Sequence, residues 1–285
     1  MNRQNKTASV RSDGERNTNA KIVDIQNNPS INNPVLSVII PVYNEASTID
    51  QLLENVVAAP FVKQIVVIDD GSSDGSLKIL EKWAQHPQIE LLRHSENRGK
   101  GAAIRTGLEH AKGQFVIVQD ADLEYDPRDY PLLIEPLMCG EADVVYGSRY
   151  LSNQTQSAPW SMFRLGVMLL NLVVRLIYGA KLSDEATCYK AFSTSLLRAM
   201  DLECERFEFC PEVTAKACLM ELTILEVPIS YHPRSRDAGK KIRIRDGVEA
   251  LATLWKWRHW QPNTVKARSL DTSVPCQRSD PMESI

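Results

Sequence analysis

Three carboxylates alternate in the segment Asp120-Ala-Asp-Leu-Glu124, which begins where the apolar segment Phe115–Asp120 ends. The apolar segment has the length of a buried strand, and in an extended chain every second side chain lies on the same face. We therefore expect the three carboxylates to point the same way. Grouped acids repel one another unless a cation offsets their charge, and Mg²⁺ and Mn²⁺ prefer carboxylate oxygens. The pattern predicts a divalent-metal site, and a polar turn before Pro127 is the alternative.

Polar residues also follow two earlier apolar segments. Leu36–Val42 leads into Tyr43, and Ile65–Asp69 leads into Asp70. In a parallel sheet these strand ends meet at one edge, where ligands bind. A carboxylate there can accept hydrogen bonds from a base or a ribose, and a tyrosine ring can stack on a base. Asp70 could instead cap the next helix, but Asp74 fits that role, so we expect Asp70 to be available to a ligand.

The elements that must position these residues alternate in type. Apolar segments of strand length are separated by segments with helical periodicity, which indicates a parallel sheet covered by helices on both faces. Strands are expected at 36–42, 65–69, 89–93, 115–120 and 143–146, and helices from residue 47, at 77–83, at 100–111 and around 129–139.

Composition limits the class of protein. Of 285 residues, 43% are hydrophobic and 24% are charged, as in ordinary globular domains. The net charge of −3 disfavours a nucleic-acid partner, and the six scattered cysteines fit free thiols in a reducing compartment. Both ends are poor in aromatic residues. We expect a disordered tail at 1–33, a catalytic domain at 34–235, a basic loop with an amphipathic helix at 236–261, and a second disordered tail at 262–285.

Five motifs occur in a telling order: Ile39-Ile-Pro-Val-Tyr-Asn-Glu45, Val67-Ile-Asp-Asp-Gly-Ser-Ser-Asp-Gly75, Asn97-Arg-Gly-Lys-Gly101, the acidic segment 120–124, and Gly147-Ser-Arg-Tyr150. With these motifs in this order, the chain resembles family 2 glycosyltransferases of the GT-A fold over about residues 35–260. It is most similar to the dolichol-phosphate mannosyltransferase and polyprenyl-phosphate glucosyltransferase branch. The resemblance implies a Rossmann-like α/β fold with a mostly parallel sheet, followed by an acceptor-side segment with amphipathic helices.

The resemblance also implies roles for individual residues. The second metal position, often Gln in the family, is Glu124 here and adds negative charge. Asp184 is the catalytic candidate on the acceptor side, and Glu212 is expected to face the sugar. The remaining roles are nucleotide binding by Pro41, Tyr43 and Glu45, base binding by Asp70 with Ile68 beside it, sugar-nucleotide contact by Asp120 and Ala121, metal binding by Asp122 with Glu124, diphosphate or sugar contact by Arg149, and phosphate contact by the basic pair Arg234 and Lys240.

The activity that these roles imply is sugar transfer. The expected enzyme depends on Mg²⁺ or Mn²⁺ and moves a hexose from a UDP- or GDP-hexose to a polyprenyl phosphate, either dolichyl or undecaprenyl, with inversion. Asp122, Arg149 and Asp184 would carry the chemistry. Two alternatives stay open at this point. The acceptor could be a saccharide or another soluble molecule, or the chain could be a non-catalytic module that binds nucleotide sugars.

The segment 161–178 is very apolar but contains Arg164, Asn171 and Arg175 on one helical side. Charges in mid-bilayer are costly, so these residues favour a helix that lies on a membrane surface over one that crosses it. A buried core helix is the alternative. The last predicted helix, 248–260, ends in tryptophans beside lysine and arginine, which suits a headgroup boundary. We expect a peripheral protein on the cytoplasmic face of a membrane, with or without a membrane-anchored partner subunit.

Overall fold

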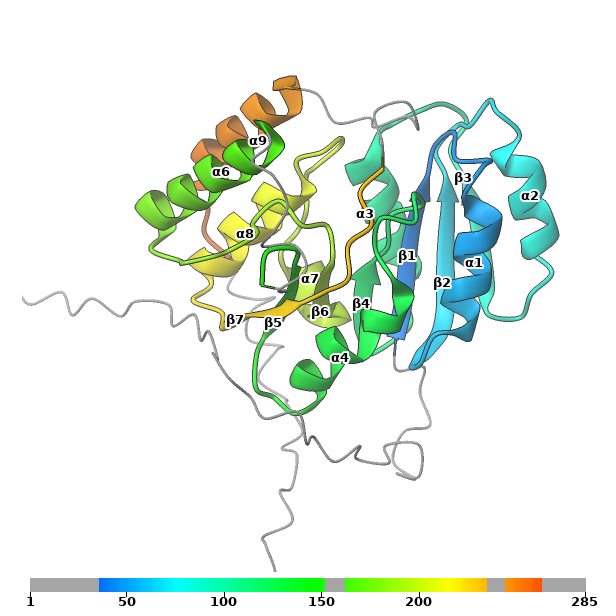
Figure 1. Ribbon diagram of the computed structural model, residues 1–285, viewed down its shortest axis with the longest axis horizontal. Helices are drawn as coiled ribbons and strands as arrows, with labels where there is room; N and C mark the ends of the chain where they lie inside the picture. Colours follow the sequence, from blue (N-terminus) through cyan, green and yellow to red (C-terminus); the bar gives the residue numbers. More distant parts are fainter. Residues whose placement is uncertain (1–35, 152–161, 235–243, 263–285) are drawn as a thin grey trace, which may run out of the picture.

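The computed structural model describes residues 36–151, 162–234 and 244–262. A seven-stranded sheet runs through these residues in the order β3-β2-β1-β4-β6-β5-β7 (Figure 1). Its strands are β1 (Leu36–Val42), β2 (Val62–Asp69), β3 (Ile89–Arg93), β4 (Phe115–Val118), β5 (Val144–Ser148), β6 (Lys190–Ser193) and β7 (Ile224–Pro228). The helices are α1 (Ile49–Ala58), α2 (Ser76–Trp83), α3 (Lys100–His110), η2 (Pro127–Asp129), α4 (Tyr130–Met138), α6 (Met162–Tyr178), α7 (Thr194–Ala199), α8 (Phe209–Leu219) and α9 (Ile244–Trp257).

The sheet is mostly parallel, as the sequence predicted. Strand β1 pairs in parallel with β2 and with β4, and β5 pairs in parallel with β7. Strand β6 is antiparallel to both of its neighbours, β4 and β5. The predicted bounds of β1 and β3 match the structure, whereas β2 begins three residues earlier than the predicted Ile65 and β4 ends at Val118, before Asp120.

Two hydrophobic cores cover the two faces of the sheet. Alternate residues of β1 divide between them: Ile39 packs with α3 on one face, and Val38 and Ile40 pack with α1 on the other. This division follows from the period-two alternation of side chains along a strand. Every residue from Leu36 to Ile40 is buried, as expected for a strand covered on both faces. The prediction of helices on both faces is therefore confirmed.

The C-terminal half gathers its helices on one face. Helix α9 packs against α8 and α6, and its residues Leu254 and Trp257 join the same core as Ile39 (Figure 1). No helix in the described part of the chain is both long enough and apolar enough to cross a membrane. The predicted tail 1–33, nearly all of 262–285, and most of the predicted basic loop lie outside the described residues.

Candidate active site

A pocket of about 630 Å³ opens at the carboxyl ends of β1, β2 and β4, which are adjacent in the sheet. Neighbouring strand ends thus bring together motifs that are far apart in the sequence, as expected for an α/β sheet. Three predicted site residues, Ile68, Asp184 and Glu212, do not line it, and Lys240 lies outside the described residues. The predicted residues that do line it are Pro41, Tyr43, Glu45, Asp70, Asp120, Ala121, Asp122, Glu124, Arg149 and Arg234.

The acidic segment after β4 is a turn, so the expectation that its carboxylates share one face of an extended chain is wrong. Leu123 has a φ of 61°, and Asp122 Oδ1 accepts a hydrogen bond of 3.1 Å from the Glu124 amide. Asp120 forms an ion pair with Lys100, at the start of α3. Glu124 accepts hydrogen bonds from the Tyr231 hydroxyl at 3.0 Å and from the Arg234 amide at 2.9 Å. The three acids therefore have different partners.

Asp122 is the acid whose surroundings most favour a cation. Burial and the charges of Asp120 and Glu124 raise the pKa of Asp122 to about 7. The hydrogen bond from the Glu124 amide and the charge of Arg234 lower it, but by less. In the described part of the chain no three Asp, Glu, His or Cys side chains are placed to share one metal ion. A carboxylate held among other acids in a pocket still fits a hard divalent cation that takes its remaining ligands from phosphate and water.

Arg234 joins three polar segments of the pocket wall. Its Nη2 donates to Glu45 Oε2 at 2.7 Å, and its Nε donates to the Asp122 carbonyl at 2.7 Å. Its own amide donates to Glu124. The predicted phosphate-contacting arginine therefore stands in the pocket, paired with acids from the ends of β1 and β4. Arg245, at the start of α9, also lines the pocket and is largely exposed.

Asp70 lines the pocket, and protein groups contact both of its carboxylate oxygens, so its availability to a ligand stays a prediction. His94 Nδ1 lies 2.6 Å from Oδ1, which also accepts from the Arg98 amide at 2.9 Å. Oδ2 accepts from the Gly99 amide at 2.8 Å. Asp70 thus fixes the loop that leads into α3. Sequence reasoning missed His94, which no motif contains.

Of two other predictions for the nucleotide side, the one for Asp74 agrees with the structure and the one for Ile68 does not. Asp74 accepts hydrogen bonds from the amide and hydroxyl of Ser76 at the start of α2, as expected, although Gly75 is the N-cap residue. Ile68 is fully buried in the core under α3 rather than in the pocket wall. A Cβ at Gly107 would come within 2.8 Å of the Ile68 Cδ1 atom, which shows how closely α3 approaches β2.

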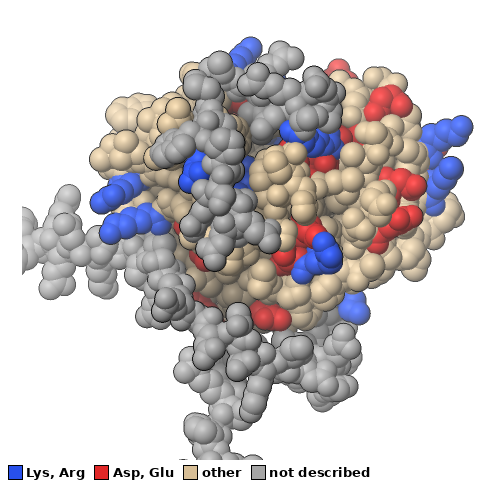
Figure 2. All heavy atoms as spheres, in the orientation of Figure 1, with Lys and Arg blue, Asp and Glu red and all other residues tan. Residues whose placement is uncertain are grey.

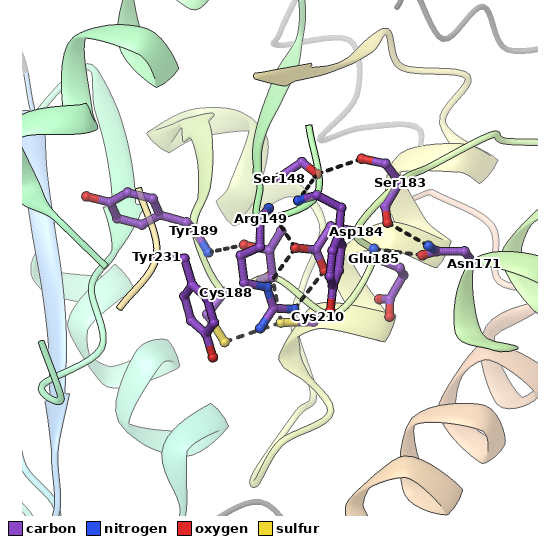
Figure 3. Close-up of polar contacts among 12 residues, drawn as sticks. Ser148, Arg149, Asn171, Ser183, Asp184, Glu185, Cys188, Tyr189, Cys210 and Tyr231 are labelled. Atoms are coloured by element: carbon purple, nitrogen blue, oxygen red, sulfur yellow. Dashed lines mark hydrogen bonds and ion pairs between the residues drawn. The ribbon is translucent and has the colours of Figure 1, made fainter. Parts of the chain in front are cut away.

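Arg149 and Asp184 form a buried pair beside the pocket (Figure 3). Arg149 Nε and Nη2 donate to the two carboxylate oxygens of Asp184, each at 2.7 Å, and the Arg149 amide donates to Oδ2 at 3.0 Å. The rings of Tyr150, Phe163 and Tyr231 lie 5.2–5.8 Å from the guanidinium carbon. Arg149 lines the pocket, whereas Asp184 is fully buried. This geometry assigns Asp184 to holding Arg149 rather than to contact with a reactant.

The loop that carries Asp184 is held from two sides. Glu226 of β7 accepts hydrogen bonds from the Ser183 amide at 2.7 Å and from the Asp184 amide at 3.0 Å. Asn171 of α6 donates to the Ser183 carbonyl at 2.7 Å and accepts from the Glu185 amide at 2.9 Å (Figure 3). Neither Glu226 nor Asn171 was singled out for the site. The available signal was a polar residue inside an otherwise apolar segment.

The expectation that Glu212 faces the sugar is wrong. Its side chain is buried in α8 and forms an ion pair of 2.5 Å with Lys216, one helical turn further on. Its oxygens also accept from the amides of Glu203 and Cys204, at 2.8 and 2.7 Å. A buried carboxylate requires such partners, and these fix the segment that runs beside the pocket.

Comparison with known proteins agrees with this geometry. A family model described as "Glycosyl transferase family 2" matches residues 37–201. The undecaprenyl-phosphate 4-deoxy-4-formamido-L-arabinose transferase of Edwardsiella ictaluri is 34% identical over 212 residues, which cover 72% of this chain and 62% of that protein. The dodecaprenyl-phosphate galacturonate synthase of Rhizobium johnstonii is 27% identical over 73% of this chain and 63% of its own length. The chain thus spans less than two thirds of these relatives.

The fold also has solved counterparts. Glucosyl-3-phosphoglycerate synthase from Mycobacterium tuberculosis, crystallised with Mn²⁺, UDP and phosphoglyceric acid, superposes with a TM-score of 0.61 at 18% identity. The match covers 81% of this chain and 80% of that one. At this identity the likeness shows the GT-A fold alone, whereas the family model and the 34% identical relative show membership. The chain belongs to glycosyl transferase family 2.

Proposed function

We propose that this glycosyltransferase moves a hexose from a UDP- or GDP-hexose to a polyprenyl phosphate, with a divalent metal ion and with inversion. The observation that carries the proposal is a pocket lined both by acids that follow strand ends and by the buried Arg149. Such a pocket suits a ligand that combines a base, a negatively charged diphosphate and a sugar. The relatives whose names specify undecaprenyl and dodecaprenyl phosphate support the acceptor class.

The nucleotide would occupy the side of the pocket formed by β1 and β4. Pro41, Tyr43 and Glu45 follow the end of β1, and the Tyr43 ring is 39% exposed, so its face is suited to stack on a base. Asp120 and Ala121 lie beside them at the end of β4. Because Asp70 holds the loop before α3, its contribution to base binding would come through that loop.

Asp122 and Glu124 are the residues that would hold Mg²⁺ or Mn²⁺. The ion, when bound there, would offset the negative charge that develops on the departing diphosphate. Its presence would also lower the mutual repulsion that raises the pKa of Asp122. The solved counterparts that contain Mn²⁺ or Mg²⁺ with UDP support this assignment.

Arg149, which follows the end of β5 and also lines the pocket, would stabilise the same departing charge. Its guanidinium is fixed by Asp184 before any ligand arrives, so little reorganisation accompanies the reaction. The acceptor phosphate would attack the anomeric carbon from the face opposite the diphosphate, which inverts the configuration. A phosphate monoester is largely ionised near pH 7, so the reaction requires little base catalysis. Asp184, with its oxygens directed at Arg149, is therefore a positioning residue.

An exposed apolar surface supports attachment to the membrane that contains such an acceptor. We define the outer row of α6 as its partly exposed apolar residues, Leu165, Met168, Leu169, Leu172 and Leu176. Helix α9 adds Trp255, which is 59% exposed, together with the basic residues Lys256 and Arg258 beside it. On the face of the molecule seen in Figure 2, basic and acidic side chains lie interspersed. An apolar row with basic neighbours is typical of helices that lie on anionic membranes, here the cytoplasmic face.

The test is incubation of the purified chain with a panel of UDP- and GDP-hexoses and a polyprenyl phosphate, with Mg²⁺, Mn²⁺ or EDTA. The proposal expects a lipid-linked phosphosugar of inverted configuration, formed in the presence of metal and lost with EDTA. Transfer to saccharides but not to the lipid would overturn the acceptor assignment. Nucleotide-sugar binding without turnover on any acceptor would instead indicate a binding module.

A further inference from the structure

Two cysteines meet at the base of the pocket. Cys188 lies two residues before Lys190, the first residue of β6, and Cys210 lies in the first turn of α8. Their sulfur atoms are 3.5 Å apart (Figure 3). Cys188 is half-buried and lines the pocket, whereas Cys210 is 6% exposed and does not line it. Neither sulfur has a part in the proposed transfer reaction.

The surroundings of the pair favour a thiolate. Lys100 Nζ donates to Cys188 Sγ at 2.9 Å, and the same lysine pairs with Asp120. The hydrogen bond between the two sulfurs raises the pKa of the Cys188 thiol and lowers that of the Cys210 thiol, and the ammonium groups of Lys190 and Lys100 also lower the pKa of Cys210. The negative charge of the pair therefore rests mainly on Cys210, and it reaches Cys188, the sulfur that lines the pocket, when the shared proton moves to Cys210. The thiolate is the form that reacts with oxidants.

We propose that Cys188 and Cys210 are an oxidation site in the pocket, which a peroxide converts to an intramolecular disulfide. The Cys188 thiolate attacks one peroxide oxygen, the O–O bond breaks, and the departing oxygen takes a proton and leaves as water. Cys188 is then a sulfenic acid. Cys210 attacks its sulfur, the S–S bond forms, the S–O bond breaks, and a second water leaves with the proton of Cys210. The peroxide is reduced, and the two thiols are oxidised.

The other described cysteines lack this combination of features. Cys204 and Cys218 are buried, and burial raises the pKa of both thiols, that of Cys218 to about 12. Cys139 is exposed at the end of α4, outside the pocket lining. Neither Cys204 nor Cys218 lines the pocket, so a peroxide that enters the pocket does not meet them. The described chain thus supplies internal controls for a selective reaction.

Oxidation should also change the pocket. A disulfide sulfur carries no negative charge and is a weak acceptor, so Lys100 loses its contact with Cys188 while it still pairs with Asp120. We expect nucleotide to bind several-fold more weakly to the oxidised protein, and bound nucleotide to slow the reaction of Cys188. These two expectations rest on the proposed function, whereas formation of the disulfide does not.

The test uses the full chain with Cys139→Ser and Cys276→Ser, the latter outside the described residues. Hydrogen peroxide is added, remaining thiols are blocked, and peptides are mapped by mass spectrometry without reduction. The proposal expects a linked pair of peptides that contain Cys188 and Cys210, reversed by dithiothreitol, with Cys204 and Cys218 still free. Cys210→Ser should leave a sulfenic acid at Cys188 that dimedone traps, and Cys218→Ser should behave as the parent.

Two results would overturn the proposal: free thiols at 188 and 210 after treatment that oxidises exposed Cys139 in the wild-type chain, or a disulfide that joins another pair. Measuring the binding of UDP and GDP to the oxidised and the reduced protein tests the oxidation site separately from the proposed sugar transfer. A 188–210 disulfide in a protein that binds neither nucleotide would remove the proposed function and leave the oxidation site. Normal sugar transfer by a protein that forms no such disulfide would remove the oxidation site and leave the proposed function.

Discussion

The two walls of the pocket are built in different ways. On the β1–β2–β4 side, the site residues are the last residues of parallel strands and the turns that follow them. On the β5–β6 side, Arg149 has partners in three other segments, Asp184 before β6, Phe163 in α6 and Tyr231 after β7, besides its own neighbour Tyr150. The residues of the first wall follow strand ends and are then held by distant partners, as Glu45 is by Arg234, whereas Arg149 in the second wall is positioned mainly by tertiary contacts.

This difference affects what each wall can tolerate. At a strand end, a side chain can change while the backbone stays in place, because the sheet hydrogen bonds hold it. In the Arg149 network, a buried charge loses its compensation when one partner is removed, which costs more than the removed contact contributed. We therefore expect substitutions in the first wall to separate activity from stability, and substitutions in the second to affect both.

The largest loss of activity is expected from Asp122→Asn. The change removes the carboxylate assigned to the metal, and turnover should fall by about two to three orders of magnitude, as for loss of other transition-state charge stabilisation. The melting temperature should not decrease, because repulsion from Asp120 and Glu124 is relieved. Steady-state kinetics over a range of Mg²⁺ and Mn²⁺, with thermal unfolding, measure both effects. Glu141→Gln, an exposed acid outside the pocket lining, is the matched control, and equal kinetics for the two variants would refute the metal assignment.

Asp184→Asn is expected to lower both the transfer rate and the stability of the fold. The amide leaves the buried Arg149 guanidinium uncompensated, so we expect about 3–5 kcal/mol of destabilisation together with slower transfer. Arg149→Lys loses the two-pronged contact, and the double variant should be no slower than Arg149→Lys alone because the residues act as a unit. The two single variants and the double variant form a double-mutant cycle with the parent, measured by urea unfolding and by single-turnover rates. Additive losses would show that Asp184 acts on a reactant rather than through Arg149.

The same contrast explains what could be predicted from the sequence. Strand bounds near Leu36 and Ile89, the mostly parallel sheet and the strand-end acids were predictable, because apolar runs and motifs are local signals. The turn at Leu123 was foreseen only as the alternative to an extended segment, because its positive φ interrupts the period-two alternation. The contact between Asp70 and His94 joins residues that no motif connects, and the contacts that hold the Asp184 loop were signalled only by polar residues, Asn171 and Glu226, inside apolar segments.

A smaller effect is expected from Asn171→Leu, which tests whether the second wall extends into α6. The leucine leaves the Ser183 carbonyl and the Glu185 amide without their partner, at about 1–3 kcal/mol. Because Arg149 then sits less firmly, kcat should fall by roughly tenfold, while the donor KM changes little. Asn171→Asp retains the acceptor for Glu185 and should restore part of the rate. Loss of stability with an unchanged kcat in both variants would confine Asn171 to a structural role.

The smallest effect on catalysis is expected from the surface of α6, where Leu169→Glu and Leu172→Glu place two charges in the outer row. These side chains are 48% and 49% exposed, so stability should change by no more than about 0.5 kcal/mol each. Transfer to a short-chain, water-soluble prenyl phosphate should be unaffected, because neither residue lines the pocket. Binding to vesicles with anionic lipid should decrease strongly, and with it transfer to a long-chain acceptor that cannot leave the bilayer. Leu169→Gln with Leu172→Gln, which adds polarity without charge, separates lost burial from repulsion by anionic lipid. If the glutamate variant sediments with vesicles as well as the parent does, the outer row is not the attachment surface, and α6 serves the pocket through Phe163 and Asn171 alone.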